Sequence, residues 1–260
     1  MRITKSFSAL DRIVAQKSED LLLRKKKMPF EEIKGSIAPS DFDFFKALSA
    51  PGLSLIAEMK KSSPSKGLIR ADFDPEKLAR IYEGRAQAIS VLCDEPFFGG
   101  KLENLSLARK NTGLPLLCKD FILEPYQIWE ARSFGADAVL LMASLLDPIE
   151  IEEMLQILRS LNMSALVEVH SEEELLEVLG TSARIVGVNS RNLRTLEIDE
   201  NVFSRLGPLI HIEKRLLVAE SGLKDREAID KVRPLADAVL IGSALMEAPD
   251  IAEKLWELGY

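Results

Sequence analysis

The residues best suited to acid–base chemistry are lysines and glutamates at or near the ends of short apolar runs. Glu58 and Lys60 close the run LSLIAEMK, and Lys119 closes PLLCK. Glu168 stands near the end of SALVEV, and Glu220 ends RLLVAE. Ammonium and carboxylate groups that share a partly dry site shift each other's pKa values, so one site can hold a general acid and a general base near neutral pH. These five side chains are the candidate catalytic groups, provided that the fold brings them together.

Glycine and serine pairs after two later runs indicate a phosphate site. Ser221 and Gly222 follow RLLVAE, whereas Gly242 and Ser243 follow AVLI and lead straight into a helical segment. Glycine lets backbone N–H groups approach an anion, and a helix N-terminus adds partial positive charge. A third polar loop, KKSSPSKG at residues 60–67, contains a proline that restricts its backbone, together with serines and a lysine that could close over a ligand.

The elements that must position these residues are strands and helices in strict alternation. Eight runs rich in Val, Ile and Leu predict strands at residues 53–60, 88–92, 115–119, 138–142, 164–169, 184–189, 215–220 and 238–242. Helices are predicted between them and after the last, at residues 75–85, 102–110, 125–134, 148–161, 172–179, 200–206, 225–232 and 244–258. Consecutive strands that are separated by helices pair in parallel through right-handed crossovers.

An internal echo favours a closed barrel. The string ADAVL occurs at 136–140 and again at 236–240, and a looser copy, AQAISVL, begins at Ala86. The copies precede or form the second, fourth and eighth predicted strands, which gives a repeat unit of about 25 residues, the size of one βα pair. The prediction is a (βα)8 TIM barrel. A doubly wound open sheet is the alternative fold, but KKSSPSKG does not match the GxGxxG turn expected after its first strand.

In such a barrel the carboxyl ends of all strands face one rim, where reacting groups lie. Asn189 ends the sixth predicted strand, and Arg191 follows two residues later, so both join the candidate set. Glu58 and Lys60 are two apart and share one face of their strand. Each charge alone could be a solvated loop residue or an ion pair that closes a barrel layer. Gathered in one mouth, such charges cost free energy unless they are paired, which favours a functional interpretation.

The first fifty residues are predicted to form a helical extension packed on the barrel, and residues 1–260 to form a single barrel domain. A helix is expected at 9–27, ending on the basic run RKKK, which suits a helix C-terminus. A second is expected at 41–48, with Ser40 as its cap.

Composition excludes several classes of protein. The 260 residues carry 34 Lys+Arg against 41 Asp+Glu, a net charge of -7, which argues against a nucleic-acid surface. No apolar run reaches the roughly 18 residues of a membrane span, and residues 1–10 do not resemble a signal peptide, so we expect a cytoplasmic protein. The two cysteines, Cys93 and Cys118, match no metal-ligand spacing and are expected to be reduced.

Several strings resemble the indole-3-glycerol phosphate synthase family of tryptophan biosynthesis. They are LIAEMKKSSPSKG (55–67), LCKDFILEPYQIWEARSFGADAVLLM (117–142), LVEVH (166–170), VGVNSRNL (186–193), AESGL (219–223) and VLIGSALM (239–246). The likeness spans about residues 5–258 in order. It implies a barrel with an additional N-terminal helical segment, no cofactor and no metal. The implied activity is that of a carbon–carbon carboxy-lyase, which converts 1-(o-carboxyphenylamino)-1-deoxyribulose 5-phosphate to indole-3-glycerol phosphate, carbon dioxide and water.

The resemblance also implies roles for the candidate residues. Lys119 matches the general acid, Lys60 a second lysine that contacts substrate, and Glu168 the general base. Glu58 and Asn189 match residues that orient the substrate.

Further roles follow from the same resemblance. Glu220 is expected to tune the lysines, and Arg191 matches the position that faces the anthranilate carboxylate, where a guanidinium fork fits two oxygens. Phosphate contacts are implied for Ser63, Ser65, Ser221, Gly222, Gly242 and Ser243. Apolar contacts to the anthranilate ring, or ordinary core packing, are implied for Phe98, Phe121, Leu140 and Leu193. The only partner expected is the phosphorylated small-molecule substrate, with no nucleic acid and no membrane, and the chain is expected to be a monomer or weak homodimer.

Two other functions compete with this interpretation. Phosphoribosylanthranilate isomerase is a smaller barrel of the same pathway with a phosphate site at the last two loops, but the two lysines, two glutamates and SPSKG loop favour the synthase. A non-catalytic phosphate-binding barrel or scaffold subunit would be expected to carry an apolar residue in place of Lys119 or Glu168.

Overall fold

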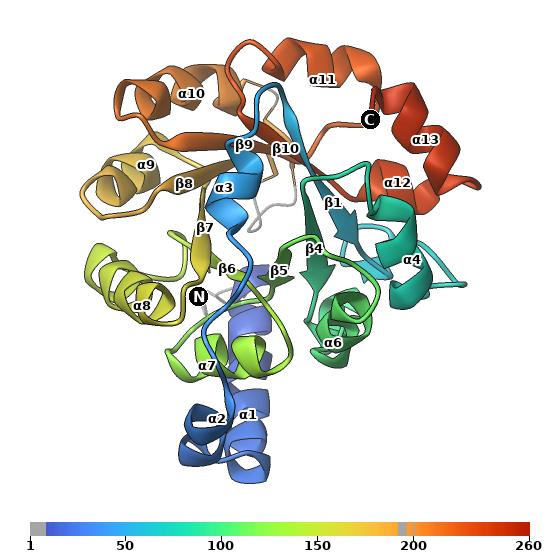
Figure 1. The fold of residues 1–260 in the computed structure, drawn as a ribbon. Helices are drawn as coiled ribbons and strands as arrows, with labels where there is room; N and C mark the ends of the chain where they lie inside the picture. The colour runs from blue at the N-terminus through green and yellow to red at the C-terminus, as the bar shows by residue number, and fades with distance from the viewer. Residues whose placement is uncertain (1–8, 192–196, 200) are drawn as a thin grey trace, which may run out of the picture.

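The computed structural model describes residues 9–191, 197–199 and 201–260 and contains the predicted closed parallel barrel (Figure 1). Its strands are β1 (Ser54–Met59), β4 (Ala88–Leu92), β5 (Leu116–Lys119), β6 (Ala138–Met142), β7 (Ser164–Val169), β8 (Ile185–Asn189), β9 (Leu216–Glu220) and β10 (Ala238–Ile241). Neighbours along the chain pair in parallel, and β1 closes the barrel by pairing with both β4 and β10. The (βα)8 prediction is therefore confirmed.

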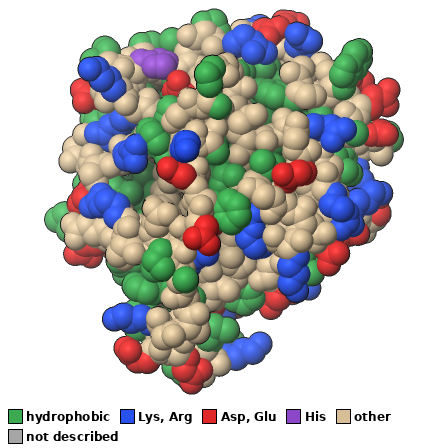
Figure 2. Space-filling view, in the orientation of Figure 1, with side chains coloured by type: hydrophobic (Ala, Val, Ile, Leu, Met, Phe, Trp, Pro, Cys, Tyr) green, Lys and Arg blue, Asp and Glu red, His purple; other side chains and the backbone are tan. Residues whose placement is uncertain are grey.

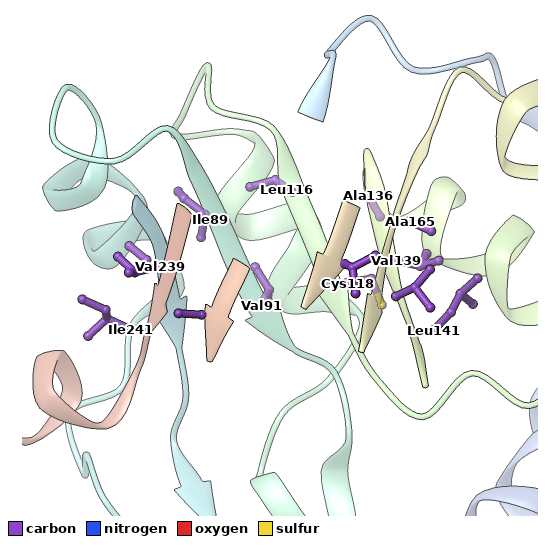
Figure 3. Close-up of a cluster of buried hydrophobic side chains, with 14 of the residues drawn as sticks. Ile89, Val91, Leu116, Cys118, Ala136, Val139, Leu141, Ala165, Val239 and Ile241 are labelled. Atoms are coloured by element: carbon purple, nitrogen blue, oxygen red, sulfur yellow. The ribbon is translucent and has the colours of Figure 1, made fainter. Parts of the chain in front are cut away.

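Alternation along the strands divides the core into two layers. On β1, Ile56 packs in the barrel interior, whereas Leu55, Ala57 and Met59 pack outward in the cluster shared with the helices. Figure 3 shows part of that outer layer, which includes Val91. Because side chains alternate with a period of two, β1 also directs Glu58 inward, like Ile56, at the end of the apolar interior.

The helices around the barrel are α4 (Pro75–Tyr82), α6 (Glu103–Arg109), α7 (Tyr126–Ser133), α8 (Pro148–Ser160), α9 (Glu172–Leu179), α10 (Val202–Ile212), α11 (Arg226–Val232), α12 (Ser243–Glu247) and α13 (Ile251–Leu258), with a short α5 (Glu95–Phe98) after β4. Six of these ten helices, α4, α5, α8, α9, α11 and α13, begin at an Asp or Ser whose side chain accepts a backbone N–H of the first turn. At α8, for example, Asp147 and Glu150 form a capping box and a proline occupies the first turn.

Most predicted helices differ from the observed ones by up to three residues at an end, and two differ by more. The single helix expected at 244–258 is two helices, because Pro249 holds the preceding Ala248 in an extended conformation and Asp250 then caps α13. The helix expected at 200–206 continues through Pro208 to Ile212, with Leu206 and Ile210 buried in the core. Its predicted first residue, at position 200, lies outside the described residues.

The N-terminal extension contains α1 (Ala9–Lys27), α2 (Phe30–Ser36) and α3 (Phe44–Leu48). Figure 1 shows α1 and α2 projecting beside α7. The first helix is confirmed, whereas α2 was not predicted. The predicted cap of α3 is wrong: Asp43 accepts the Lys46 N–H at 2.8 Å, while Ser40 donates to the buried carboxylate of Asp137. Figure 2 shows basic and acidic side chains interspersed over one face of the molecule.

The sequence echo corresponds to a repeated structural contact. In each copy a side-chain oxygen just before the strand accepts a backbone N–H of the preceding barrel strand, at 2.7–2.8 Å: Asp137 binds Leu116, Asp237 binds Leu217, and Gln87 binds Leu55. These contacts lie at the amino-terminal ends of the strands. The echo therefore records how adjacent strands are joined at the end of the barrel opposite the candidate site.

Candidate active site

A cleft of about 1110 Å³ opens at the carboxyl ends of the strands and collects the predicted residues. Its lining includes the polar candidates Glu58, Lys60, Ser63, Ser65, Lys119, Glu168, Asn189, Arg191, Glu220, Ser221, Gly222, Gly242 and Ser243 and the apolar candidates Phe98, Phe121 and Leu140. Leu193 lies outside the described residues. Barrel closure thus brings together side chains that are up to about 185 residues apart in sequence.

Lys119 lies at the centre of the charged groups. Its Nζ is 2.6 Å from Oε2 of Glu220, 3.7 Å from Oε2 of Glu58 and 3.9 Å from Oε2 of Glu168. Lys60 Nζ lies 2.7 Å from the other oxygen of Glu58. The three glutamate side chains are only 1–4% exposed. Two ammonium groups therefore face three buried carboxylates.

This imbalance separates the protonation behaviour of the groups. Burial opposes the charge of Lys119, but the carboxylates of Glu220, Glu58 and Glu168 outweigh it and raise the pKa of the lysine. Burial likewise opposes the charge of Glu58, yet Lys60 and Lys119 lower its pKa. For Glu220 burial prevails over the attraction of Lys119, and its pKa rises to about 8. The site therefore holds a protonated lysine beside carboxyl groups of unequal acidity, as acid–base catalysis requires.

Two glycines leave the space that the carboxylates occupy. A Cβ at Gly187 of β8 would overlap Oε1 of Glu220, and a Cβ at Gly242 would overlap Oε1 of Glu58. Gly242 was predicted as a phosphate contact, and the structure adds this second reason for its identity. Gly187 was missed, although a single glycine inside the run RIVGVN is a signal of close approach by another group.

His170 and Glu174 were also missed. His170 Nε2 lies 3.1 Å from Oε1 of Glu168, and its Nδ1 lies 3.3 Å from Oε2 of Glu174. The signal was available for the histidine, because it stands two residues after Glu168 and thus on the same face of the chain. Glu174 is on the first turn of α9, and only the strand-to-helix turn brings it back to the site.

The loop after β9 has an unusual backbone. Ser221 has φ of 65° and Gly222 has φ of 76°, so two consecutive residues adopt left-handed conformations. For serine this conformation carries strain, which in proteins gathers at ligand and catalytic sites. At the end of the neighbouring β8, Asn189 Oδ1 accepts the Arg191 N–H at 2.9 Å and fixes the turn that carries the arginine.

The loop after β1 forms a small hairpin, β2 (Ser62–Ser63) and β3 (Gly67–Leu68), at the rim of the cleft. The Ser63 and Ser65 hydroxyls lie 3.4 Å apart, and Lys66 forms an ion pair with Glu247 of α12. The apolar part of the lining includes Phe98 and Phe121, whose ring centroids are 6.1 Å apart. The aromatic part of the lining thus adjoins this hairpin, because α5, which ends at Phe98, packs against β2.

Helix α1 is anchored next to the site by a buried ion cluster. Lys17 Nζ lies 2.8 Å from Asp94 and 2.6 Å from Asp120, and all three side chains are at most 3% exposed. Asp120 directly follows Lys119, and Ile13 of the same helix lines the cleft. The extension therefore belongs structurally to the catalytic end of the barrel.

Residues 9–191, 197–199 and 201–260 lack two other kinds of feature. They contain no group of three or more His, Cys, Asp or Glu side chains arranged to hold a metal ion. None of their helices is both long and apolar enough to cross a membrane.

The comparison with known families agrees with this site. A family model described as indole-3-glycerol phosphate synthase matches residues 10–258. The chain belongs to this family. A relative of that name from Dehalococcoides mccartyi (strain CBDB1) is 45% identical over 257 residues, which cover 96% of this chain and 99% of the relative. A relative of the same name from Aliarcobacter butzleri (strain RM4018) is 43% identical over 254 residues, which cover 95% of this chain and 96% of the relative. The resemblance of the motifs to indole-3-glycerol phosphate synthases is thus confirmed.

Solved structures support the fold alone. The tryptophan synthase A-subunit of Pyrococcus furiosus superposes with a TM-score of 0.59 at 17% identity, covering 79% of this chain and 97% of that one. A 3-hexulose-6-phosphate synthase gives a TM-score of 0.63 at 18% identity, with coverage of 79% and 98%. Both likenesses cover the barrel-sized part of the chain at identities too low to indicate an activity.

Proposed function

We propose that the cleft converts 1-(o-carboxyphenylamino)-1-deoxyribulose 5-phosphate to indole-3-glycerol phosphate by ring closure, decarboxylation and dehydration, with Lys119 as the general acid and Glu168 as the general base. Family membership carries the overall carboxy-lyase activity of tryptophan biosynthesis. The observation that supports the residue roles is the position of the Lys119 ammonium among Glu58, Glu168 and Glu220.

Ring closure needs a proton at the ribulosyl carbonyl. As the ring carbon that bears the carboxylate attacks C2, the new C–C bond forms and the carbonyl π electrons move to oxygen, where Lys119 delivers its proton. The raised pKa of Lys119 keeps that proton on the lysine until negative charge develops on the oxygen. Lys60, paired with Glu58, lies near enough in the same cleft to stabilise that charge or to share the proton transfer.

Decarboxylation and dehydration complete the conversion. The C–CO2 bond electrons return to the ring system as carbon dioxide leaves. The hydroxyl formed in the first step then leaves as water with a proton from an acid, while Glu168 removes the proton whose loss forms the indole double bond. Burial opposes the charge of Glu168, but His170, Lys119 and Asn189 together lower its pKa to about 2. Glu168 is therefore an ionised carboxylate, the form of a base, in the free enzyme.

The remaining residues orient the substrate. Glu58 and Asn189 face the ribulose hydroxyls, Arg191 pairs with the anthranilate carboxylate, and Glu220 holds Lys119 in place. The phosphate is held by the polar loops at Ser63, Ser65, Ser221, Gly222, Gly242 and Ser243, and the anthranilate ring packs on Phe98, Phe121 and Leu140. All of these groups come from one chain, so the proposed reaction requires no second copy of the protein. We also propose that the protein acts in the cytoplasm.

The test is to incubate the purified protein with 1-(o-carboxyphenylamino)-1-deoxyribulose 5-phosphate and to monitor the fluorescence of the indole product. Lys119→Ala and Glu168→Gln are each expected to lower turnover by roughly 10²- to 10⁴-fold, the usual contribution of one acid–base group, with an unchanged circular dichroism spectrum. Lys46→Ala and Glu173→Gln, which alter exposed groups of the same types, are the matched controls. Wild-type turnover in either active-site variant would remove the role assigned to that residue.

A further inference from the structure

The His170 ring is placed between two carboxylates beside the proposed base. Its Nε2 lies 3.1 Å from Oε1 of Glu168, and its Nδ1 lies 3.3 Å from Oε2 of Glu174. The His170 side chain is 9% exposed and that of Glu168 only 1%. Apart from this contact, neither Glu168 Oε1 nor His170 Nε2 has a well-aligned hydrogen bond from the described residues. The two atoms therefore compensate part of each other's charge.

Glu168 needs such a partner, because the ammonium groups serve the other carboxylates first. Lys60 is committed to Glu58 at 2.7 Å, and Lys119 lies 2.6 Å from Glu220 but 3.9 Å from Glu168. A carboxylate buried beside two others becomes protonated unless a cation compensates it. A protonated Glu168 could not act as a base.

The start of α9 holds the histidine in position. Glu174 Oε2 accepts the backbone N–H of His170 at 2.7 Å, and Ser171 Oγ accepts the N–H of Glu174 at 3.2 Å. The same hydrogen bonds that begin the helix thus orient Glu174 toward Nδ1. Burial opposes a charged ring, but Glu168 and Glu174 outweigh it and raise the pKa of His170 to about 10. The ring is an imidazolium at neutral pH.

The charged groups that face this pair come from four other helices and strands and from the loop after β8. Lys119 of β5 lies 3.9 Å from Glu168, and Glu174 of α9 lies on the far side of the ring. Glu58 of β1 and Glu220 of β9 both interact electrostatically with Glu168. Arg191, after β8, lines the same cleft. Removing the imidazolium therefore leaves the Glu168 carboxylate beside the carboxyl groups of Glu58 and Glu220, with the Lys119 ammonium 3.9 Å away and closer to Glu220.

We propose that His170, held by Glu174, is a positioning residue that fixes the Glu168 carboxylate with Oε2 toward Lys119 and keeps it ionised. The inference rests on the proposed role of Glu168 as general base. In this rotamer Oε1 of Glu168 contacts the ring at 3.1 Å, and Oε2 lies 3.9 Å from Lys119 Nζ. The histidine itself does not touch substrate.

The proposal gives a definite pH dependence. A general base loses activity as the pH falls through its pKa, and loss of a neighbouring cation raises that pKa. His170→Ala is therefore expected to move the acidic limb of the kcat/KM profile to higher pH. It is also expected to lower kcat by roughly 10- to 100-fold, less than loss of the base itself, and to leave KM within about twofold. Glu174→Gln, which leaves the ring in place, is expected to give a smaller shift in the same direction.

His211 provides the matched control, because it is the other histidine of the chain, and its exposed ring contacts the Leu235 carbonyl and does not line the cleft. His211→Ala is expected to leave kcat and the pH profile unchanged. Circular dichroism and thermal melts establish that each variant is folded. Wild-type kcat and an unmoved acidic limb in folded His170→Ala would overturn the proposal.

A second measurement does not depend on activity. With two histidines in the chain, imidazole NMR signals of the wild type are assignable by comparison with His211→Ala. The His170 signals are expected to remain those of an imidazolium between about pH 6 and pH 8, and to titrate within this range in Glu168→Gln. A neutral His170 in the wild type would refute the inference even if the enzyme is active. Absence of turnover in the wild type would instead refute the proposed function and leave the NMR result to decide the pairing.

Discussion

Buried carboxylates at the two ends of the barrel differ in how many hydrogen bonds they accept. At the amino-terminal ends of the strands, Asp137 accepts four hydrogen bonds of 2.6–3.0 Å: from Ser40, Arg109, Arg132 and the Leu116 N–H. At the carboxyl ends, both oxygens of Glu168 and Oε1 of Glu220 lack well-aligned donors among the described residues. Asp137 is thus saturated with hydrogen-bond donors, whereas Glu168 and Glu220 are not.

The difference indicates which end of the barrel contributes stability and which contributes reactivity. A saturated buried carboxylate links the extension, two helices and a strand, and removing it would leave two arginines without their partner. At the carboxyl ends, Glu168 and Glu220 line the cleft, and Glu168 Oε2 and Glu220 Oε1 retain acceptor capacity that a substrate or a moving proton can use. Stability is thus concentrated at one rim and reactivity at the other, as the barrel architecture allows.

Substitution of the saturated carboxylate is expected to have the largest effect on stability. Asp137→Ala should lower the free energy of unfolding by about 3–5 kcal/mol, because Arg109 and Arg132 lose a buried partner. Asp237→Ala, at the equivalent position of the echo, should cost only about 1–3 kcal/mol, the cost of leaving the Leu217 N–H unpaired. Urea denaturation measures both. Turnover per folded molecule should stay at the wild-type value, and a large loss of turnover would contradict the division between the two ends.

A methyl group at the catalytic rim is expected to act mainly on turnover. Gly187→Ala should displace the Glu220 carboxylate, lengthen its contact with Lys119 and lower kcat about 10-fold, at a stability cost of about 1–3 kcal/mol. A double-mutant cycle with Glu220→Ala isolates the route of the effect. If Gly187 acts through Glu220, the added methyl should change kcat little in that background. Independent, additive losses would show that Gly187 matters for another reason.

The smallest expected effect concerns the surplus charge of the catalytic cluster. The pKa of Glu220 is raised by burial to about 8, above its unfolded value, so its stabilising contribution is present below the unfolded pKa and is lost as the pH rises through 8. Glu220→Gln cannot ionise and should be more stable than wild type by about 0.5–2 kcal/mol at pH 8, with the difference vanishing near pH 4.5. Thermal melts across this range test the trend. A difference that does not change with pH would mean that Glu220 is not strained by its burial.

The sequence alone determined the parts of this protein that depend on local periodicity and on strand ends. Alternating strand and helix patterns predicted the barrel, and the polar residues after the apolar runs predicted the mouth, because all carboxyl ends of a parallel barrel face one rim. The family followed from long ordered strings such as LIAEMKKSSPSKG. Helix α2 was missed and the cap of α3 was wrong, because both depend on how the extension packs.

Only the tertiary structure decided which charges meet. Closure of the barrel sets β1 beside β10 and turns Glu220 toward Lys119, a pair separated by about 100 residues. The space beside Gly187 and the return of Glu174 to His170 follow from the same packing. No periodic pattern encodes such contacts, because they depend on the stagger of strands and the turn of the chain between them.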